Sequence, residues 1–553
     1  MNNTNKKRYP IECFILVTAS YLVMYYFTFT GFNGSDDLHY AKLANNMLNG
    51  SYNPFEPNDI FAGRALLISW QAFIYFIGGI NTFTTQIGSL IAIVLSCYLT
   101  IFRLGRFKEW QTVFGCSILF YFNPVLNTTT LGISPDVYIM LLGILLLILW
   151  RNINNEDNKK KAIFKSISFG AISFIALFIK ENALIFIPFI FFISLLENRG
   201  KNLPMALISI ATFFIFIFFS GFVYYHYTGD FYLRVHQIIN SSSTANGCMY
   251  DMSTIGALIK RLTFGAWQRF ITEGFYPVIL AAFLLIAKTL KANGFKIQVS
   301  SIEKIFIVLL LLGLYFPFSL KGYQPLCIRC RHFIFLLAPA VILCASYLEE
   351  GVKRKFLLWE FISVSALICC ICVMSTGNKW FWMVYVFLLL FFVLLKICHL
   401  PIILKYRYFI LLPILSLFIF YKTIYYKSNW FKNLQSVNAK VDGYYFYFPD
   451  HDNMLHFQLL NKFNKNYSYY NLEKDTYKIY ALYYNKVDTS NFKKGWFIVN
   501  KAYTGASQNF LTFTDSLQTN SYFKKQFTEG DINAFYIDTK ETLDYIKTII
   551  KEK

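Results

Sequence analysis

Long hydrophobic runs recur along most of this chain, and they constrain its fold more than any other feature. Each run spans about 17–23 residues, enough to cross the hydrocarbon core of a bilayer as a helix. Over 553 residues the chain is 56% hydrophobic and only 15% charged. A soluble domain of this size rarely carries so large an apolar fraction. The sequence therefore predicts a polytopic α-helical membrane protein.

Basic residues in the short loops between these runs predict the orientation, because Lys and Arg concentrate in cytoplasmic loops. The same placement accounts for much of the net charge of +21, so we expect no nucleic-acid partner. The run at 65–80 is assigned to the membrane interface, since the basic loop 103–108 would otherwise fall outside. We expect about 13 crossings, near 13–30, 84–102, 110–125, 132–150, 163–179, 182–196, 204–225, 273–290, 303–320, 332–348, 356–375, 379–397 and 407–422.

The composition changes sharply after the last run. Residues 1–423 form the predicted membrane domain, with an extracytoplasmic loop at 32–83. From about 424 to 553, Asn, Lys, Asp and Tyr replace the Leu, Ile and Phe runs. Strands are expected at 444–448 and 496–499, and helices at 453–463 and 541–550. An odd number of crossings would place this small α/β domain outside the cell membrane, which we expect to be a bacterial inner membrane.

An acidic motif follows the first hydrophobic run. Asp36 and Asp37 are adjacent carboxylates near lipid, where burying charge is costly. If the following residues are helical, Asp36 shares one face with His39 and Tyr40. An alternative is that Ser35 and the two aspartates only cap the start of a helix. The motif is nevertheless the first candidate for a catalytic site.

Other charged residues lie near the predicted outer ends of the spans. For any one of them, a side chain reaching from the interface into water is a sufficient explanation. Their collection on one side of the membrane is what indicates a site. These residues are Arg64, Asp136, Lys180, Glu181, Arg234, His236 and Arg331.

Sugar transfer from a polyprenyl phosphate fits this set of side chains. The leaving group of such a donor is already an anion, so it needs positive charge rather than a proton. Arg can grip phosphate with two parallel hydrogen bonds. The acceptor hydroxyl must lose its proton, which calls for one carboxylate base. Glycoside hydrolysis, in contrast, uses a carboxylate pair. We expect the transfer to invert the anomeric configuration.

The order of these motifs resembles that of C-type glycosyltransferases, in particular lipid A aminoarabinose transferases and protein O-mannosyltransferases. The resemblance rests on Asp36-Asp37 with Tyr40-Ala41, Arg64 opening an interfacial helix, Pro135-Asp136 at a helix start, Lys180 at a span junction, and Arg331 ahead of Leu336–Pro339. It implies that Asp36 is the base and that Asp37 belongs to the catalytic site. It also implies donor-phosphate binding by Arg64 and Lys180, and Arg331 is our third candidate for this role. We expect no cofactor; a divalent metal is an alternative that the sequence does not indicate. Many relatives have Glu in place of Asp37, and Lys followed by prolines in place of Arg64.

Two other functions share some of these features. A transporter or lipid flippase also keeps charges among its helices, but it would more naturally show repeats and charges near the bilayer midplane. A polymerase or ligase of surface polysaccharide would use the same donors and differ mainly in the acceptor. The expected partners are a polyprenyl-phosphate-linked sugar, membrane lipid, and an acceptor that is a glycan, a lipid or a protein.

One cysteine pair lies in a predicted outside loop. Cys327 and Cys330 are close enough in sequence to form a disulfide there. A metal site with His332 is a second alternative. We favour a merely structural role for the pair.

Overall fold

The structure is a computed structural model of the whole chain. It describes residues 9–29, 31–32, 35–57, 59–129, 132–197, 200–242, 256, 259, 263–291, 299–317, 326–327, 329–353, 386, 389–390, 393, 430–448, 451–464, 466–471, 492–500, 523, 526–529 and 532–551.

Helices make up nearly all of the described membrane part. Each of the first ten predicted spans coincides with helical structure. Of the last three, only residues 386, 389–390 and 393 are described, and these are helical. The helices are α1 (Tyr9–Thr28), α2 (Ser35–Leu48), α3 (Ala65–Gly78), α4 (Thr82–Tyr98), α5 (Trp110–Tyr121), α6 (Pro124–Thr129), α7 (Pro135–Asn154), α8 (Lys159–Leu177), α9 (Phe186–Leu196), α10 (Leu203–Thr228), α11 (Leu233–Ser242), α13 (Gly265–Thr272), α14 (Tyr276–Lys291), α15 (Ser301–Tyr315) and α16 (Leu337–Lys353).

Three short segments of other helix types join these helices. A π-helix, η2 (Leu99–Gly105), continues α4, and 3-10 helices η3 (Glu181–Ile185) and η5 (Cys330–Leu336) precede α9 and α16. Five helical segments among the described residues are long and apolar enough to cross a membrane: Tyr9–Phe27, Thr82–Gly105, Pro135–Asn154, Leu203–Thr228 and Cys330–Tyr347. The chain is therefore described as a multi-pass membrane protein, and the total of 13 crossings stays a prediction.

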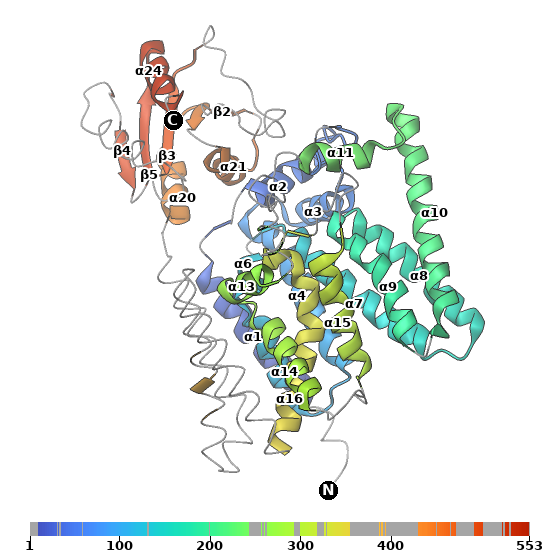
Figure 1. Ribbon diagram of the computed structural model, residues 1–553. Coiled ribbons are helices and arrows are strands. Elements are labelled where there is room, and N and C mark those ends of the chain that lie inside the picture. Colours follow the sequence, from blue (N-terminus) through green and yellow to red (C-terminus); the bar gives the residue numbers. More distant parts are fainter. Residues whose placement is uncertain are drawn as a thin grey trace.

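Helix α3 is too short to span a bilayer upright. Its 14 residues correspond to about 21 Å at 1.5 Å per residue, against a hydrocarbon core of about 30 Å. It packs against α2 and α4, and the Gln71 amide donates a hydrogen bond to the Thr84 carbonyl (2.9 Å). Figure 1 shows α2, α3 and α11 together at one end of the long helices. This arrangement agrees with the interfacial position predicted for the segment.

The tail forms an α/β unit around a five-stranded mixed sheet of order β2-β1-β3-β5-β4. Strand β1 pairs in parallel with β2 and β3, while β5 pairs antiparallel with β3 and β4. The strands are β1 (Tyr445–Phe448), β2 (Ser468–Asn471), β3 (Gly495–Asn500), β4 (Gln526–Glu529) and β5 (Ile532–Ile537), with helices α20 (Trp430–Lys440), α21 (His451–Leu460) and α24 (Lys540–Lys551). The two predicted strands coincide with β1 and β3, and the two predicted helices with α21 and α24. Strands β2, β4 and β5 were not predicted.

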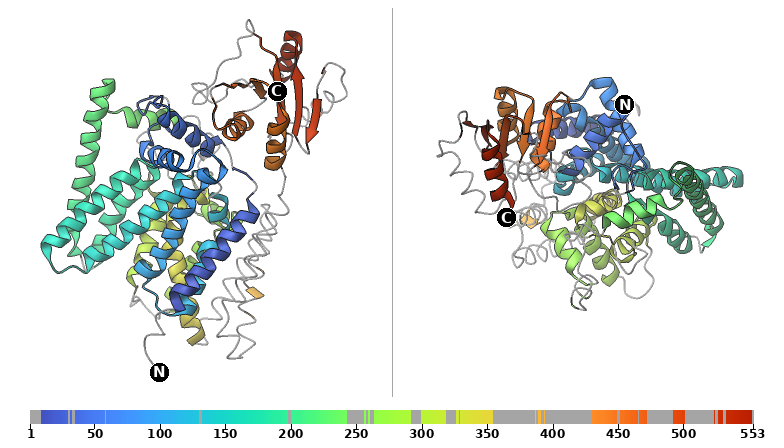
Figure 2. Two further views of the ribbon diagram at one scale, coloured as in Figure 1. Left: turned by 180° about the vertical axis from the view of Figure 1, so that it is seen from behind. Right: turned by 90° about the horizontal axis from the view of Figure 1, so that it is seen from above.

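The α/β unit lies at the same end of the molecule as α2 (Figures 1 and 2). Helix α21 packs against α2. Next to α2, the buried ring of Phe32 lies 5.9 Å from the ring of Phe431 and 6.2 Å from that of His456, measured between centroids. Apolar contacts therefore join the tail to the segment that carries the acidic motif.

Candidate active site

Helix α2 carries the acidic motif in its first turn. Asp36 and Asp37 follow Ser35 there, where negative charge interacts favourably with the helix dipole. The helix ends before a turn at Asn49 and Gly50, and Gly50 has a φ of 69°, as the C-cap pattern predicts. Stabilising the helix start and contributing to a site are therefore compatible roles for the two acids.

Asp36 faces a cation from a distant part of the chain. Its carboxylate lies 3.9 Å from a guanidinium nitrogen of Arg331, in the first turn of η5. Both side chains are accessible: Asp36 is 44% exposed and Arg331 is 41% exposed. An ion pair that solvent still reaches can exchange its partner for a ligand at modest cost.

Asp37 has different surroundings from Asp36. Burial and the neighbouring charge of Asp36 raise the pKa of Asp37 from 3.8 to about 7, although Arg331 and Lys180 oppose the shift. The carboxyl group lies against Gly132, where an added Cβ would come within 2.6–2.8 Å of it. Glycine is thus the residue that lets the backbone pass this close to the acid.

Lys180 forms a buried ion pair with Asp136. Its ammonium group lies 2.6 Å from the Asp136 carboxylate, and the two side chains are 9% and 6% exposed. Asp136 stands in the first turn of α7, and Lys180 immediately precedes η3. Two span ends are thereby joined. Because both charges are buried, removing either one would leave the other uncompensated.

His332 completes this cluster. The sequence shows it beside Arg331 ahead of a predicted span, and also as an alternative metal ligand with the cysteine pair. Its Nδ1 lies 3.2 Å from the Lys180 ammonium and 3.1 Å from the amide nitrogen of Asn182. An ammonium group can only donate hydrogen bonds, so Nδ1 is the acceptor and the ring proton lies on Nε2. His332 is adjacent to Arg331 in the chain, so its ring helps to fix the position of η5.

Glu181 binds two arginines on the other side of the site. Its carboxylate accepts a hydrogen bond from Arg64 at 2.7 Å and another from Arg234. Arg64 also donates to the hydroxyl of Tyr40. Burial acts to raise the pKa of Glu181, but the two arginines outweigh it and lower that pKa to about 2. Glu181 is therefore a fixed anion that holds two cations in place.

Lys180 and Glu181 are neighbours in sequence, and they connect the two clusters. Lys180 reaches Asp136 while Glu181 reaches the arginines. Four cationic side chains meet four carboxyl side chains here. They are Arg64, Lys180, Arg234 and Arg331, with Asp36, Asp37, Asp136 and Glu181. The structure thus assembles eight of the sequence-predicted residues, together with Tyr40, at one end of the membrane helices.

Two predicted site residues have other surroundings. His39 is fully buried, and its Nε2 lies 3.5 Å from Asp59 rather than facing Asp36. The Asp59 carboxylate also accepts the backbone N–H of Phe61 (2.8 Å), so His39 contributes to the loop that leads to Arg64. His236 is 53% exposed and contacts Asp230 at 2.7 Å on the protein surface. The shared helical face predicted for Asp36 and His39 is therefore not used.

The cysteine pair has a structural environment. No disulfide joins Cys327 to Cys330. The backbone N–H of Cys330 donates to the Glu273 carboxylate (2.8 Å), which ties η5 to the end of α13. Among the described residues, no group of three or more His, Cys, Asp and Glu side chains is arranged to hold a metal ion. The absence of a cofactor stays a prediction.

Comparisons with known proteins identify solved structures that have a similar fold. No protein-family model matches the chain, and no curated protein sequence matches it. The structure is similar to the crystal structure of ArnT from Cupriavidus metallidurans bound to undecaprenyl phosphate. The TM-score is 0.58 at 12% identity, over 95% of this chain and 98% of that one. This chain has the fold of a C-type glycosyltransferase.

Further solved structures show the same kind of similarity. ArnT in the apo state matches with a TM-score of 0.56 at 11% identity, over 94% of this chain and 97% of that one. An oligosaccharyltransferase from Archaeoglobus fulgidus matches less closely, with a TM-score of 0.43 at 11% identity over 81% of this chain and 61% of that one. The family resemblance seen in the sequence motifs is confirmed at the level of the fold. The roles of individual site residues stay predictions.

Proposed function

We propose that this protein is an integral-membrane glycosyltransferase that moves a sugar from a polyprenyl-phosphate donor to an acceptor hydroxyl. The observation that carries the proposal is the accessible Asp36–Arg331 pair, in which a carboxylate lies 3.9 Å from a guanidinium, a group that is well suited to bind phosphate. The pair occurs in a fold shared almost end to end with ArnT, whose structure holds undecaprenyl phosphate. The active site is proposed to face the extracytoplasmic side of a bacterial inner membrane.

The cations divide into an accessible one and buried ones. Arg331 is 41% exposed, whereas the side chains of Arg64 and Lys180 are each 9% exposed and already contact carboxylates within 2.7 Å. We therefore assign the first contact with the donor phosphate to Arg331. Arg64 and Lys180 lie behind it and supply positive potential, which is effective in a low-dielectric site. The sequence analysis gave Arg64, Lys180 and Arg331 the same role in binding the donor phosphate. We now propose that only Arg331 contacts the phosphate first.

A single displacement follows from this arrangement. When the donor phosphate binds Arg331, the Asp36 carboxylate is released from its partner and can accept the proton of the acceptor hydroxyl. The acceptor oxygen forms a bond to the anomeric carbon while the bond from that carbon to the phosphate oxygen breaks. The polyprenyl phosphate leaves as an anion, stabilised by Arg331. Attack opposite the leaving group inverts the anomeric configuration.

A reconstituted transfer assay would test this function. The purified protein in lipid vesicles would receive a panel of radiolabelled polyprenyl-phosphate sugars together with candidate glycan, lipid and protein acceptors. We expect one donor to lose its sugar and yield polyprenyl phosphate at a rate that depends on the protein. Movement of intact donor across the vesicle membrane, without cleavage of any sugar, would instead establish the flippase alternative. Transfer onto a growing glycan would identify a polymerase or ligase.

A further inference from the structure

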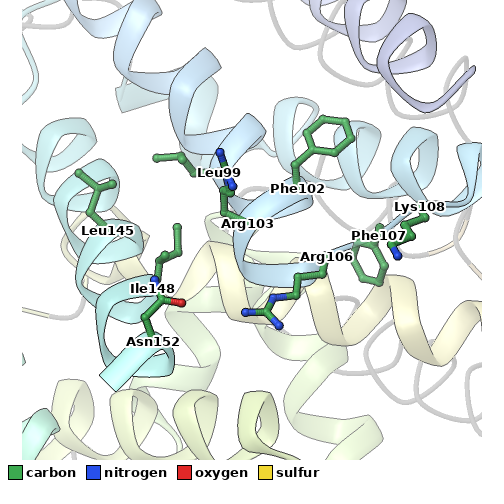
Figure 3. Close-up of a pocket in the computed structure, with 9 residues that line it drawn as sticks. All are labelled: Leu99, Phe102, Arg103, Arg106, Phe107, Lys108, Leu145, Ile148 and Asn152. Carbon is green, nitrogen blue, oxygen red and sulfur yellow. The ribbon is translucent and has the colours of Figure 1, made fainter. Parts of the chain in front are cut away.

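A second polar site lies far from Asp36. A pocket of about 670 Å³ opens at the junction of η2 with α7 (Figure 3). It is lined by Leu99, Phe102, Arg103, Arg106, Phe107, Lys108, Leu145, Ile148 and Asn152. Three of these side chains are cationic, five are apolar and none is acidic. The pocket thus combines a positive rim with an apolar wall.

Helix α7 carries residues of both this pocket and the active site, so its length gives their separation. Asp136 lies in the first turn of α7, whereas Asn152 lies in the last turn. The 16 residues between them correspond to about 24 Å at 1.5 Å per residue, close to the thickness of a hydrocarbon core. Because α7 is long and apolar enough to span the membrane, the two sites lie at opposite membrane surfaces. The pocket is not part of the catalytic site.

The chain departs from regular helix to form this pocket. After α4, residues Leu99–Gly105 wind as a π-helix, and Arg106 then adopts a left-handed conformation with a φ of 56°. Non-glycine residues rarely take that conformation, and π-helical turns often accompany functional sites. An added Cβ on Gly105 would lie 2.7 Å from the Phe107 ring, so this glycine lets the ring fold back onto η2. These features position Arg106 and Phe107 at the rim.

The charged side chains of the rim are available to a ligand. Arg103, Arg106 and Lys108 are all exposed. Arg151, on the last turn of α7, donates a hydrogen bond to the Leu104 carbonyl and so joins α7 to η2 behind the rim. In contrast, Lys159–Lys161 are exposed at the start of α8, at the same end of the molecule, but do not line the pocket. This end of the molecule therefore has two basic surfaces: the rim of the pocket, and the start of α8, which lines no pocket.

We propose that this pocket binds one anionic phospholipid from the leaflet opposite the active site. The phosphate contacts Arg103, Arg106 and Lys108, while an acyl chain lies along the apolar wall formed by residues such as Leu145 and Ile148. Basic pockets between membrane helices are suited to anionic head groups. A free anion would contact only the cationic rim and would leave the five apolar lining residues without a partner. An anionic lipid contacts both the rim and the apolar wall, so we infer that the occupant is a lipid. Zwitterionic lipids carry no net charge and bind more weakly.

Lipid binding to the full-length protein would test this proposal. Delipidated protein in neutral detergent would be titrated with phosphatidylglycerol and with phosphatidylcholine, and bound lipid counted by native mass spectrometry. We expect one phosphatidylglycerol to bind at least tenfold more tightly than phosphatidylcholine. The triple variant R103Q/R106Q/K108Q should lose that preference. The charge-matched control K159Q/K160Q/K161Q should keep it.

Three results would overturn the proposal. The triple variant could retain the preference, the control could lose it equally, or inorganic phosphate could displace the lipid at comparable concentration. The first would remove the pocket as the site, the second would indicate general attraction to a basic surface, and the third would indicate an anion site only. If the triple variant does not fold, the single variants R103Q and K108Q, both at exposed positions, should each lower the affinity severalfold. If neither single variant changed the affinity for phosphatidylglycerol, the pocket would likewise be excluded as the lipid site.

Discussion

The guanidinium of Arg331 lies 3.9 Å from the carboxylate of Asp36. Arg331 lies in the first turn of η5 and Asp36 in the first turn of α2, so the contact depends on the packing of segments about 300 residues apart in sequence. Partial exposure of both side chains distinguishes this pair from the buried Lys180–Asp136 pair. The difference supports our proposal that Asp36 and Arg331 take part in ligand binding and chemistry, while Lys180 and Asp136 hold the surrounding helices in place.

Replacing Arg331 should weaken donor binding without unfolding the protein. R331Q removes the exposed cation proposed to meet the donor phosphate, and a charge-assisted hydrogen bond of this kind contributes about 1.5–3 kcal/mol, or roughly 10- to 150-fold in affinity. Affinity for undecaprenyl phosphate would be measured in detergent beside thermal stability. R329Q is the matched control, because Arg329 is an exposed arginine two residues away. Equal effects of the two substitutions would contradict a specific role for Arg331.

Breaking the Lys180–Asp136 pair should act mainly on stability. K180M leaves the Asp136 carboxylate buried without its cation, a change that costs about 3–5 kcal/mol in proteins. The double variant K180M/D136L removes both charges and should recover most of the lost stability. Thermal unfolding in detergent, followed by circular dichroism, would measure both effects.

Another ion pair provides the control for that comparison. Lys165 and Glu156 form an ion pair in which both side chains are 20% or more exposed. Exposed pairs contribute little to stability because solvent screens them, so E156Q should shift the unfolding midpoint little. A K180M variant as stable as E156Q would mean that the Lys180–Asp136 pair is well hydrated.

Asp37 should make the stability of the protein depend on pH. Its pKa is raised in the folded state to about 7 from 3.8, so the folded protein holds this proton more tightly than the unfolded chain does. Stability is therefore favoured at low pH and falls as pH rises through about 7. D37N carries a neutral side chain at every pH, so the difference in unfolding midpoint between D37N and wild type should grow between about pH 4 and pH 7 and level off above that. A constant difference over that range would rule out the shifted pKa.

Much of the fold was predictable because apolar runs of membrane length and α-helical periodicity are local signals. The run at 65–80 was assigned to the interface from charge placement alone, and the structure shows a helix there, α3, that is too short to span a bilayer upright. The strands β2, β4 and β5 were not predicted, although they are as long as β1 and β3, which were. Short strands depend on partners distant in sequence, which no local pattern reveals.

The site was predictable in its residue types but not in its pairing. Lys180 and Glu181 were identified at a span junction, yet nothing in the sequence indicated that they would turn towards different partners. His39 was placed on the face of Asp36 by helical spacing, whereas its partner is Asp59, twenty residues further along the chain. His332 joined the site through Lys180, a contact between residues separated by 152 positions. Pairings of this kind follow from tertiary packing.

The central claim is that Asp36 is the base, and turnover by D36N tests it most directly. Asn keeps the size of the side chain but cannot accept the proton of the acceptor hydroxyl. With a donor identified by the vesicle assay, D36N should bind that donor with near-normal affinity and transfer its sugar about 10²–10⁴ times more slowly than wild type. D37N, measured in parallel, should retain more activity. Transfer by D36N at the wild-type rate would contradict the account.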